Sequence, residues 1–174
     1  MRVAILTLSR RVARGIREDV GGDAVAQRVR REGMEVVERR VIGDDDKILA
    51  WHLVRLSDHP KVDLILTTGG TGLSVHDVTP EATLSVLEKR LSAMEWVMFQ
   101  AGLQKTPHAM LSRAVAGSRN KTLIINLPGS PKGAIENLEA VLPAIPHAIR
   151  VLQAQQVQDD EHRAPQPEQQ KDKS

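Results

Sequence analysis

The chain has 174 residues, which is the length of about one globular domain, and 41% of them are hydrophobic and 26% charged. It contains no cysteine, which excludes disulfides, thiolate metal sites, iron–sulfur clusters and cysteine nucleophiles. The net charge is only +2 and the aromatic residues are one Phe and two Trp, so the chain lacks the charge and the stacking side chains of a nucleic-acid binder.

Apolar and helical segments alternate in the first third of the chain. Residues 3–8 (VAILTL) form a continuous apolar run, typical of a buried strand, whereas the polar, glycine-bearing residues 10–22 predict a loop. Residues 23–32 predict a helix that ends at a glycine, and the valine-rich residues 34–42 predict a second strand. A helix is expected over residues 44–57, where apolar side chains recur on one side.

The middle of the chain predicts another buried strand followed by two helices. Residues 62–67 (VDLILT) form the strand, which leads into a pair of glycines. Thr79 and Pro80 are typical of a helix start, with Thr79 as the capping residue and Pro80 in the first turn. We expect this helix to continue to about residue 90 and a second helix to occupy residues 92–103.

The last third predicts two strands and a long helix. Residues 111–116 suit a short edge strand or hairpin arm, and residues 122–127 (TLIINL) form a third buried-type strand. A helix is expected over residues 131–152, and Pro143 and Pro146 should kink or split it, because proline cannot donate the helical hydrogen bond.

Apolar strands joined by helical crossovers predict an α/β protein, in which helices cover both faces of a mostly parallel, mixed sheet. We expect one folded domain over residues 1–153 and a disordered, glutamine-rich tail over residues 154–174. No apolar run reaches the ~18 residues of a membrane span, and no signal peptide is visible. We therefore expect a cytoplasmic protein that binds neither a membrane nor nucleic acid, and whose slightly basic body suits an anionic small molecule.

Ligands of open α/β sheets bind beyond the carboxyl ends of the strands, where three loops of unusual composition lie. The first, TTGGTG, combines glycines, which let the backbone approach a ligand closely, with threonine hydroxyls, and it can cradle a phosphate. Its candidate binding residues are Thr68, Gly69, Gly70, Thr71 and Gly72. Asp77 follows just before a predicted helix. The alternative is a tight turn in which Asp77 is a second capping residue.

The second loop, NLPGSPKG, connects the strand at residues 122–127 to the last predicted helix. Backbone N–H groups at a helix start attract anions, and Lys132 would add positive charge. The candidate substrate-binding residues here are Pro128, Gly129, Ser130 and Lys132. The alternative is a plain strand-to-helix turn, which would have much the same composition.

The third loop places Asp44 at the start of a predicted helix. A carboxylate there can bind magnesium (Mg2+), which takes few protein ligands and completes its shell with phosphate oxygens. Asp44 and Asp77 together predict a magnesium–phosphate site. The alternative is that acidic residues favour a helix start without binding a metal.

Two stretches of this sequence, in this order, resemble the MogA/MoaB family of molybdenum cofactor biosynthesis proteins. They are TTGGTG followed by DVTPEA, and the stretch at residues 106–149 that contains LSR and NLPGSPKG. The similarity extends over residues 3–149. It implies a three-layer α/β/α fold, a homotrimer and molybdopterin adenylyltransferase activity. Such an enzyme transfers AMP from Mg-ATP to the phosphate of molybdopterin and releases pyrophosphate, and its product then accepts molybdate from a partner protein.

The resemblance also implies roles for individual residues. Asp77 matches the family's catalytic aspartate after the glycine loop, and Asp44 matches the one after the second strand; both would act with magnesium and the reacting phosphates. Ser112 and the loops at residues 68–72 and 128–132 match substrate-binding positions. ATP and molybdopterin are the substrates that this assignment implies.

Three residues depart from the family pattern and support a second hypothesis. His76 stands where the family commonly has arginine, and Trp96 and Phe99 stand where it often has charged residues. The alternative function is therefore a non-catalytic molybdopterin-binding carrier or assembly subunit of the same family. A nucleotide hydrolase resembling CinA is a third hypothesis, which the DVTPE run disfavours.

Overall fold

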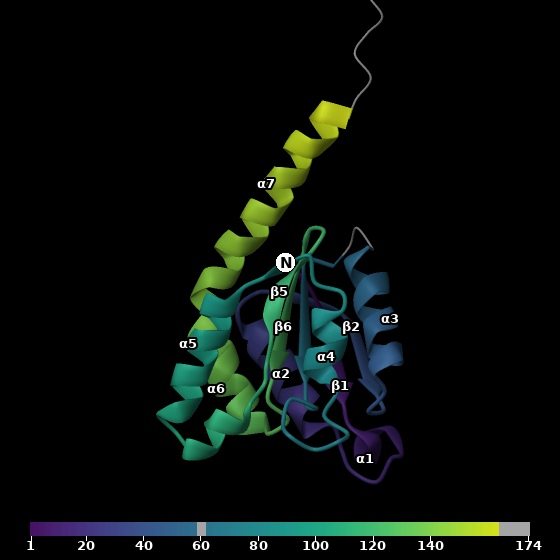
Figure 1. Ribbon diagram of the computed structural model, residues 1–174, viewed down its shortest axis with the longest axis vertical. Helices are drawn as coiled ribbons and strands as arrows, with labels where there is room; N and C mark the ends of the chain where they lie inside the picture. The colour runs from purple at the N-terminus through teal and green to yellow at the C-terminus, as the bar shows by residue number, and fades with distance from the viewer. Residues whose placement is uncertain (59–61, 164–174) are drawn as a thin grey trace, which may run out of the picture.

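A six-stranded mixed sheet forms the middle layer of the computed structural model, which describes residues 1–58 and 62–163 (Figure 1). The strand order is β2-β1-β3-β6-β5-β4. Neighbours from β2 to β6 run parallel, whereas β5 is antiparallel to both β6 and β4. The strands are β1 (Arg2–Leu8), β2 (Glu35–Ile42), β3 (Leu64–Thr68), β4 (Lys89–Arg90), β5 (Ala116–Arg119) and β6 (Thr122–Leu127).

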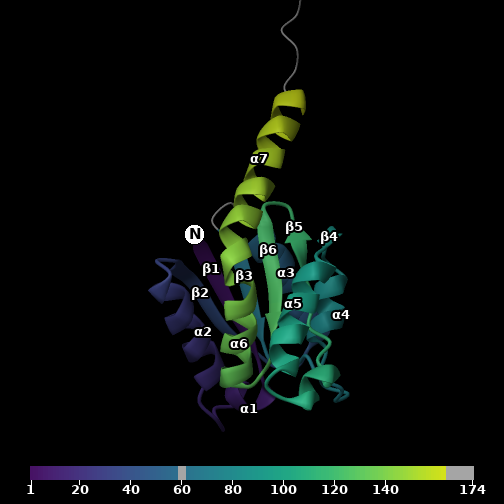
Figure 2. The same ribbon diagram turned by 90° about the vertical axis from the view of Figure 1, so that its left-hand side faces the viewer.

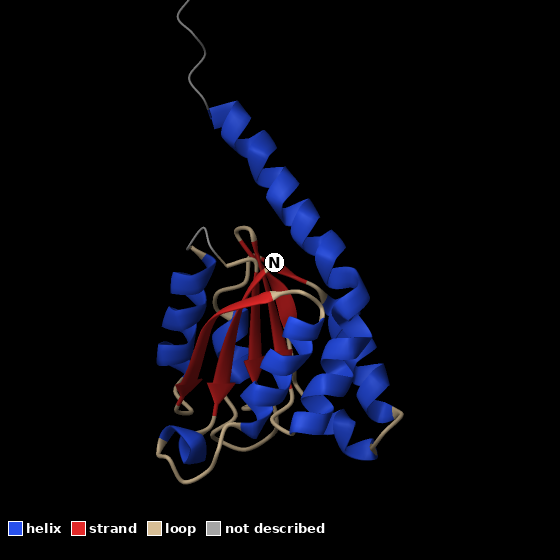
Figure 3. Cartoon of the chain, turned by 180° about the vertical axis from the view of Figure 1, so that it is seen from behind, coloured by secondary structure: helices blue, strands red, loops and turns tan. Residues whose placement is uncertain are grey.

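Helices cover both faces of this sheet, as the apolar strands predict (Figure 3). The α-helices are α1 (Arg10–Ala13), α2 (Val20–Arg31), α3 (Asp46–Ser57), α4 (Thr79–Leu84), α5 (Ser92–Leu103), α6 (Pro131–Val141) and α7 (Ile145–Arg163). The 3-10 helices are η1 (Pro107–Leu111) and η2 (Leu142–Ala144). The predicted α/β class and three-layer arrangement are confirmed.

Two aliphatic clusters, one on each face, hold the layers together. Alternate residues of β1 belong to different clusters. Val3 and Ile5 pack with α2, α5, α6 and α7, whereas Ala4 and Leu6 pack with α3 and α4. Figure 2 shows α2, α6 and α5 side by side over the first face. Because both faces are covered, the central strands read as unbroken apolar runs, and the ligand-accessible polar groups lie at the strand ends.

The prediction of a loop over residues 10–22 is wrong. Residues Arg10–Ala13 form α1, and α2 begins at Val20, before the predicted start at residue 23. The Asp19 side chain caps α2 by accepting from the Gly22 N–H at 2.9 Å. Gly21 and Gly22 in the first turn weaken the helical signal of this segment, but the cap satisfies a free N–H group and compensates for them.

The helix predicted from Thr79 to about residue 90 is shorter than expected. It ends at Leu84, and Lys89–Arg90 instead form the edge strand β4, which pairs with β5. Pro80 lies in the first turn as predicted, but Val78 holds the capping position and Thr79 donates its hydroxyl to Gly69 O at 2.9 Å. The helix predicted over residues 44–57 likewise begins two residues later, with Asp45 as its cap.

The strand predicted over residues 111–116 is also misplaced. The helix η1 ends at Leu111, residues 112–115 form neither helix nor strand, and the hairpin arm β5 begins at Ala116, antiparallel to β6. The long helix predicted over residues 131–152 is divided at Pro143 into α6, η2 and α7, as its prolines predict. The other predicted strands and the helix over residues 92–103 match β1, β2, β3, β6 and α5.

The last helix, α7, continues to Arg163 and therefore enters the segment that we expected to be a disordered tail. Residues 164–174 of that tail lie outside the described residues, so the domain boundary at residue 153 stays a prediction. Within the described part of the chain, no helix is both long and apolar enough to cross a bilayer.

Candidate functional site

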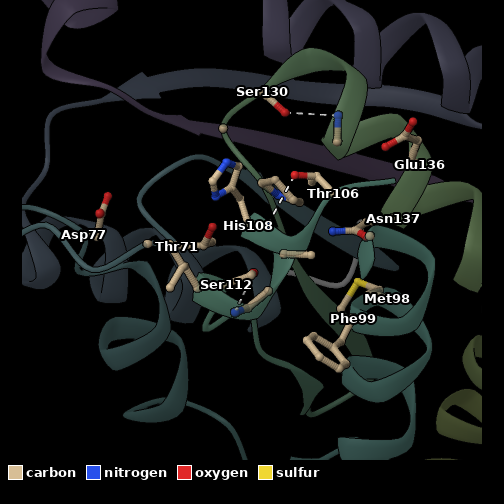
Figure 4. Close-up of a pocket in the computed structure, with 18 of the residues that line it drawn as sticks. Thr71, Asp77, Met98, Phe99, Thr106, His108, Ser112, Ser130, Glu136 and Asn137 are labelled. Carbon is tan, nitrogen blue, oxygen red and sulfur yellow. Dashed lines mark hydrogen bonds between the residues drawn. The ribbon is translucent and has the colours of Figure 1, made fainter. Parts of the chain in front are cut away.

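A pocket of about 450 Å³ opens where the parallel strands end (Figure 4). The loop after β3, the loop between β6 and α6, helix α5 and the segment around η1 line it. It brings together most of the residues that the sequence singled out: Gly70, Thr71, Gly72, Asp77, Ser112, Pro128, Gly129 and Ser130. The position agrees with the rule that open α/β sheets bind ligands beyond the carboxyl ends of their strands.

The glycine loop depends on backbone conformations that other residues rarely adopt. Gly69 and Gly70 have φ angles of 95° and 65°. A side chain on Gly69 would also overlap with the carbonyl oxygen of Leu8, and one on Gly70 would overlap with the Thr79 hydroxyl. The glycines therefore let the chain reverse tightly between β3 and α4, so that Thr71 and its neighbours face the pocket.

Arg113, which follows the pocket residue Ser112, holds this loop in place. Its backbone N–H donates to Thr71 O at 2.9 Å, its Nε to Gly72 O at 2.7 Å and its Nη2 to Asp77 O at 2.7 Å. A further ion pair joins Arg113 Nη1 to Glu81. Burial acts to raise the pKa of Glu81, but the hydrogen bond and charge of Arg113 outweigh it and lower the pKa.

Asp77 lies at the mouth of the pocket, on the loop that Arg113 holds. Its Oδ2 accepts from the backbone N–H of Ser74 at 2.8 Å, and its own N–H donates to Ser74 O at 2.8 Å. These bonds close a small turn that fixes the direction of the carboxylate. His76, the departure from the family pattern, belongs to the same turn but does not line the pocket.

Asp44 does not line the pocket that contains Asp77. It follows β2, whereas Asp77 follows β3, and β1 lies between these strands. The Asp44 carboxylate forms an ion pair with Arg10 Nε at 3.0 Å. Among the described residues, no group of three or more His, Asp or Glu side chains could hold a metal ion. The shared magnesium site therefore stays a prediction.

The loop before α6 provides the second polar wall of the pocket. Ser130 caps this helix by accepting from the Gly133 N–H at 3.1 Å, and its carbonyl oxygen accepts from the Ala134 N–H at 2.8 Å. Because Pro131 has no N–H group, the backbone N–H of Lys132 is the one in this turn that stays available to an anion. Ser112 lines the opposite side and accepts from the Ala114 N–H at 3.4 Å. Lys132 is 85% exposed in its side chain and does not line the pocket.

A second, smaller hollow of about 190 Å³ adjoins the pocket and shares Gly70 and Gly129 with it. It contains the predicted residues Thr68 and Gly69, together with Asp19 at the start of α2. Asp19 accepts from the Thr7 hydroxyl at 3.0 Å and pairs with Arg39 at 3.2 Å. We did not single out Asp19 from the sequence, although aspartate is one of the residues preferred at a helix N-cap.

The inner wall of the pocket consists of residues from α5 and α6, of which the sequence singled out only Phe99. Met98 and Phe99 form an apolar surface there, and Glu136 and Asn137 lie opposite (Figure 4). Phe99 therefore lines the pocket, whereas Trp96 packs against it at 5.5 Å between ring centroids and is 60% exposed on the outside.

Comparisons with known proteins place this architecture in a family. A model described as a probable molybdopterin binding domain, MoCF_biosynth, matches residues 4–147. The molybdopterin adenylyltransferase of Helicobacter pylori is 40% identical over 152 residues, which span 86% of this chain and 86% of that protein. That of Escherichia coli K12 is 34% identical over 172 residues, which span 91% and 88%. The molybdopterin biosynthesis enzyme MoaB from Thermus thermophilus superposes with a TM-score of 0.82 at 46% identity, covering 87% of this chain and 95% of that one.

Proposed function

We propose that this chain, which belongs to the MoCF_biosynth family of molybdopterin-binding domains, is a molybdopterin adenylyltransferase of molybdenum cofactor biosynthesis. It would transfer AMP from ATP to the phosphate of molybdopterin and release pyrophosphate. One observation carries this proposal: the Asp77 carboxylate, a glycine loop and the start of α6 meet in one pocket. Both substrates carry phosphate groups. The glycine loop and the helix start can bind phosphates, and the carboxylate can hold a magnesium ion that aligns them.

The proposed reaction requires little covalent chemistry from the protein. A phosphate oxygen of molybdopterin attacks the α-phosphorus of ATP, a new P–O bond forms, and the bond to the bridging oxygen breaks with release of pyrophosphate. The protein must align the two phosphates and neutralise their charge. The N–H groups of the glycine loop and the N–H at the start of α6 would bind phosphate oxygens, with the Ser112 hydroxyl as a further donor.

The residues in the pocket fit a magnesium ion bound in part by its substrate. Magnesium takes one or two carboxylates and completes its shell with waters and phosphates, so a cluster of three acidic residues is not required. Asp77 would hold the ion, because its carboxylate lines the pocket in a fixed orientation. We propose Asp44 as the second carboxylate, where the ion would compete with Arg10. The bound ion would neutralise charge on the reacting phosphates.

The finer assignments concern assembly and location. We propose a cytoplasmic homotrimer that passes its product to a molybdate-insertion partner protein. Apolar side chains on the surface support self-association: Leu84 is 44%, Val97 43% and Trp96 60% exposed. Exposed patches of this kind commonly mark protein–protein contacts.

The deciding assay uses purified protein with molybdopterin and Mg-ATP, followed for the adenylylated product and for pyrophosphate. The proposal expects product that depends on ATP and is lost with a magnesium chelator. Tight binding of molybdopterin without any product would instead support the carrier hypothesis, for which the departures at His76, Trp96 and Phe99 are the argument. Failure to bind molybdopterin at all would contradict both.

A further inference from the structure

Two neighbouring residues of α6, Glu136 and Asn137, face the pocket at the end opposite Asp77 (Figure 4). Neither belongs to the loops that would bind phosphates. They lie across from Met98, which is 1% exposed, and from the ring of Phe99. This end of the pocket therefore combines an apolar wall with two polar side chains, which is the composition of a site for a flat heterocycle.

Asn137 carries a buried amide group that borders the pocket. The residue is 6% exposed, and its Oδ1 is buried without a hydrogen-bond partner. Figure 4 shows its amide nitrogen turned toward Thr106 and His108, across the pocket. The amide nitrogen, and not the buried oxygen, is therefore the atom of Asn137 that can bond to a ligand, and it can donate to an acceptor in the pocket.

Glu136 provides a carboxylate that is mostly enclosed and only weakly paired. Its side chain is 21% exposed, and its ion-pair partner Lys132 lies 4.0 Å away with 85% of its own side chain exposed. By contrast, Glu139 on the same helix is 52% exposed and pairs with Arg28 at 2.9 Å. The Glu136 carboxylate is thus free to accept two hydrogen bonds side by side.

We propose that Glu136 and Asn137 bind the edge of the pterin ring and select an amino-oxo heterocycle over adenine. A pterin presents an exocyclic amino group beside a ring N–H, two donors that match one carboxylate, and next to them a carbonyl oxygen that can accept from the Asn137 amide. Adenine presents a single donor beside a ring nitrogen acceptor, and that acceptor would face the lone pairs of Glu136. The pterin ring therefore lies between α5 and α6, with its phosphate toward the glycine loop.

This assignment rests on the proposed function for the identity of its ligand, but it is measurable without turnover. Guanosine monophosphate carries the same amino-oxo edge as a pterin, and adenosine monophosphate differs from it in the base alone. Isothermal titration of both nucleotides therefore reports on base recognition. We expect wild-type protein to bind the guanine nucleotide about tenfold more tightly than the adenine nucleotide.

The test variant is Glu136→Gln, and Glu139→Gln is the matched control on the outer side of the same helix. Glutamine offers one acceptor instead of two, so Glu136→Gln should remove most of the tenfold preference and leave the affinity for adenosine monophosphate unchanged. Glu139→Gln should keep the preference. Asn137→Leu, a second and independent variant of similar volume, should weaken only the guanine nucleotide. Thermal unfolding of each variant shows whether it is folded.

In turnover, Glu136→Gln should raise KM for molybdopterin about tenfold with KM for ATP unchanged. Absence of a guanine preference in the wild type, or a preference that survives Glu136→Gln, would overturn the assignment. A rise in KM for ATP alone would do so as well, because it would place adenine at this end of the pocket. If guanine selectivity is found but no adenylylated product forms, the proposed activity fails and the base-recognition site stands.

Discussion

Where the strands of the sheet begin, near the N-terminus in Figure 1, charged and polar side chains satisfy one another. Arg2 Nη2 lies 3.0 Å from Asp63 Oδ1, the Arg2 backbone N–H donates to Asp63 Oδ2 at 2.7 Å, and Asn120 Nδ2 donates to Asp58 at 2.7 Å. Where the strands end, near α1, the carboxylates of Asp77 and Glu136 and the amide of Asn137 face a pocket instead.

The difference separates groups that stabilise the fold from groups that are available to a ligand. A polar side chain paired within the protein contributes to stability and has little left to offer a substrate. One that faces a cavity contributes less to stability and can bind. The same substitution should therefore lower mainly the activity where the strands end and mainly the stability where the strands begin.

The largest effect is expected for aspartates at the strand ends. Asp77→Asn should lower the rate of adenylylation by about a hundredfold or more, because a neutral amide would hold the magnesium ion at the reacting phosphates much less well than a carboxylate. Asp44→Asn should also abolish most activity if Asp44 is the second carboxylate. Rates of product formation at saturating Mg-ATP measure both.

Asp63→Asn is the control for these variants, because it is the same substitution at the other end of the sheet. Its rate should equal that of the wild type. Full activity in both Asp77→Asn and Asp44→Asn would contradict the catalytic assignment.

A smaller loss, about tenfold in kcat/KM, is expected for Arg113→Gln. Arg113 acts through the glycine loop, and glutamine cannot replace its three side-chain contacts with Gly72, Asp77 and Glu81. We expect Arg113→Gln to lower kcat by a larger proportion than it lowers the free energy of unfolding. Arg113→Lys should recover little, because a single ammonium group cannot reproduce the planar fork of arginine.

Arg2→Gln provides the comparison at the opposite end, and it should change stability without changing kcat. Steady-state kinetics and urea unfolding, measured on the same preparations, separate the two readouts. Equal kcat in Arg113→Gln and wild type would show that the loop holds its shape without this side chain.

The smallest effect concerns Asp63 and the stability of the protein. Asp63→Asn should lower the free energy of unfolding by about 1–2 kcal/mol, the usual range for a hydrogen bond to a charged group. Urea unfolding at neutral pH measures this loss. A variant as stable as the wild type would mean that the pairing at this end of the sheet contributes nothing.

The same pair predicts a pH dependence. Burial acts to raise the pKa of Asp63, but its hydrogen bonds with Arg2 and the charge of Arg2 outweigh burial and lower the pKa. A carboxyl group whose pKa is lower in the folded state stabilises the protein at neutral pH, and this contribution is lost as the pH falls below about 4. The difference in stability between wild type and Asp63→Asn should therefore shrink in acid. A constant difference would exclude the ion pair as its source.

The parts of the site that were predictable from sequence are those with local signals. The glycine loop and the serine before α6 could be placed at strand ends, because apolar runs define the strands and glycine or proline, which mark turns, follow them directly. Arg113, Glu136 and Asn137 had no such signal. Arg113 matters because it contacts residues 71–81 from another loop. Asn137 matters because its position on α6 places it in the pocket wall.

The same distinction explains the errors in the fold. Helix α2 begins early because the Asp19 cap outweighs two glycines, and β4 replaces the end of a predicted helix because β5 pairs with it. In both places a specific partner outweighs intrinsic propensity, and for β4 the partner is distant in sequence.

The anchoring of the glycine loop by Arg113 also bears on how the protein refolds. The contacts join residues 72–81 to residue 113, and the end of α4 and all of β4, α5 and η1 lie between them along the chain. Contacts across such separations form late, because the intervening chain has to be ordered before they contribute. After dilution from denaturant, helical circular dichroism should therefore recover before substrate binding does, with a time lag that lengthens when Arg113 is replaced.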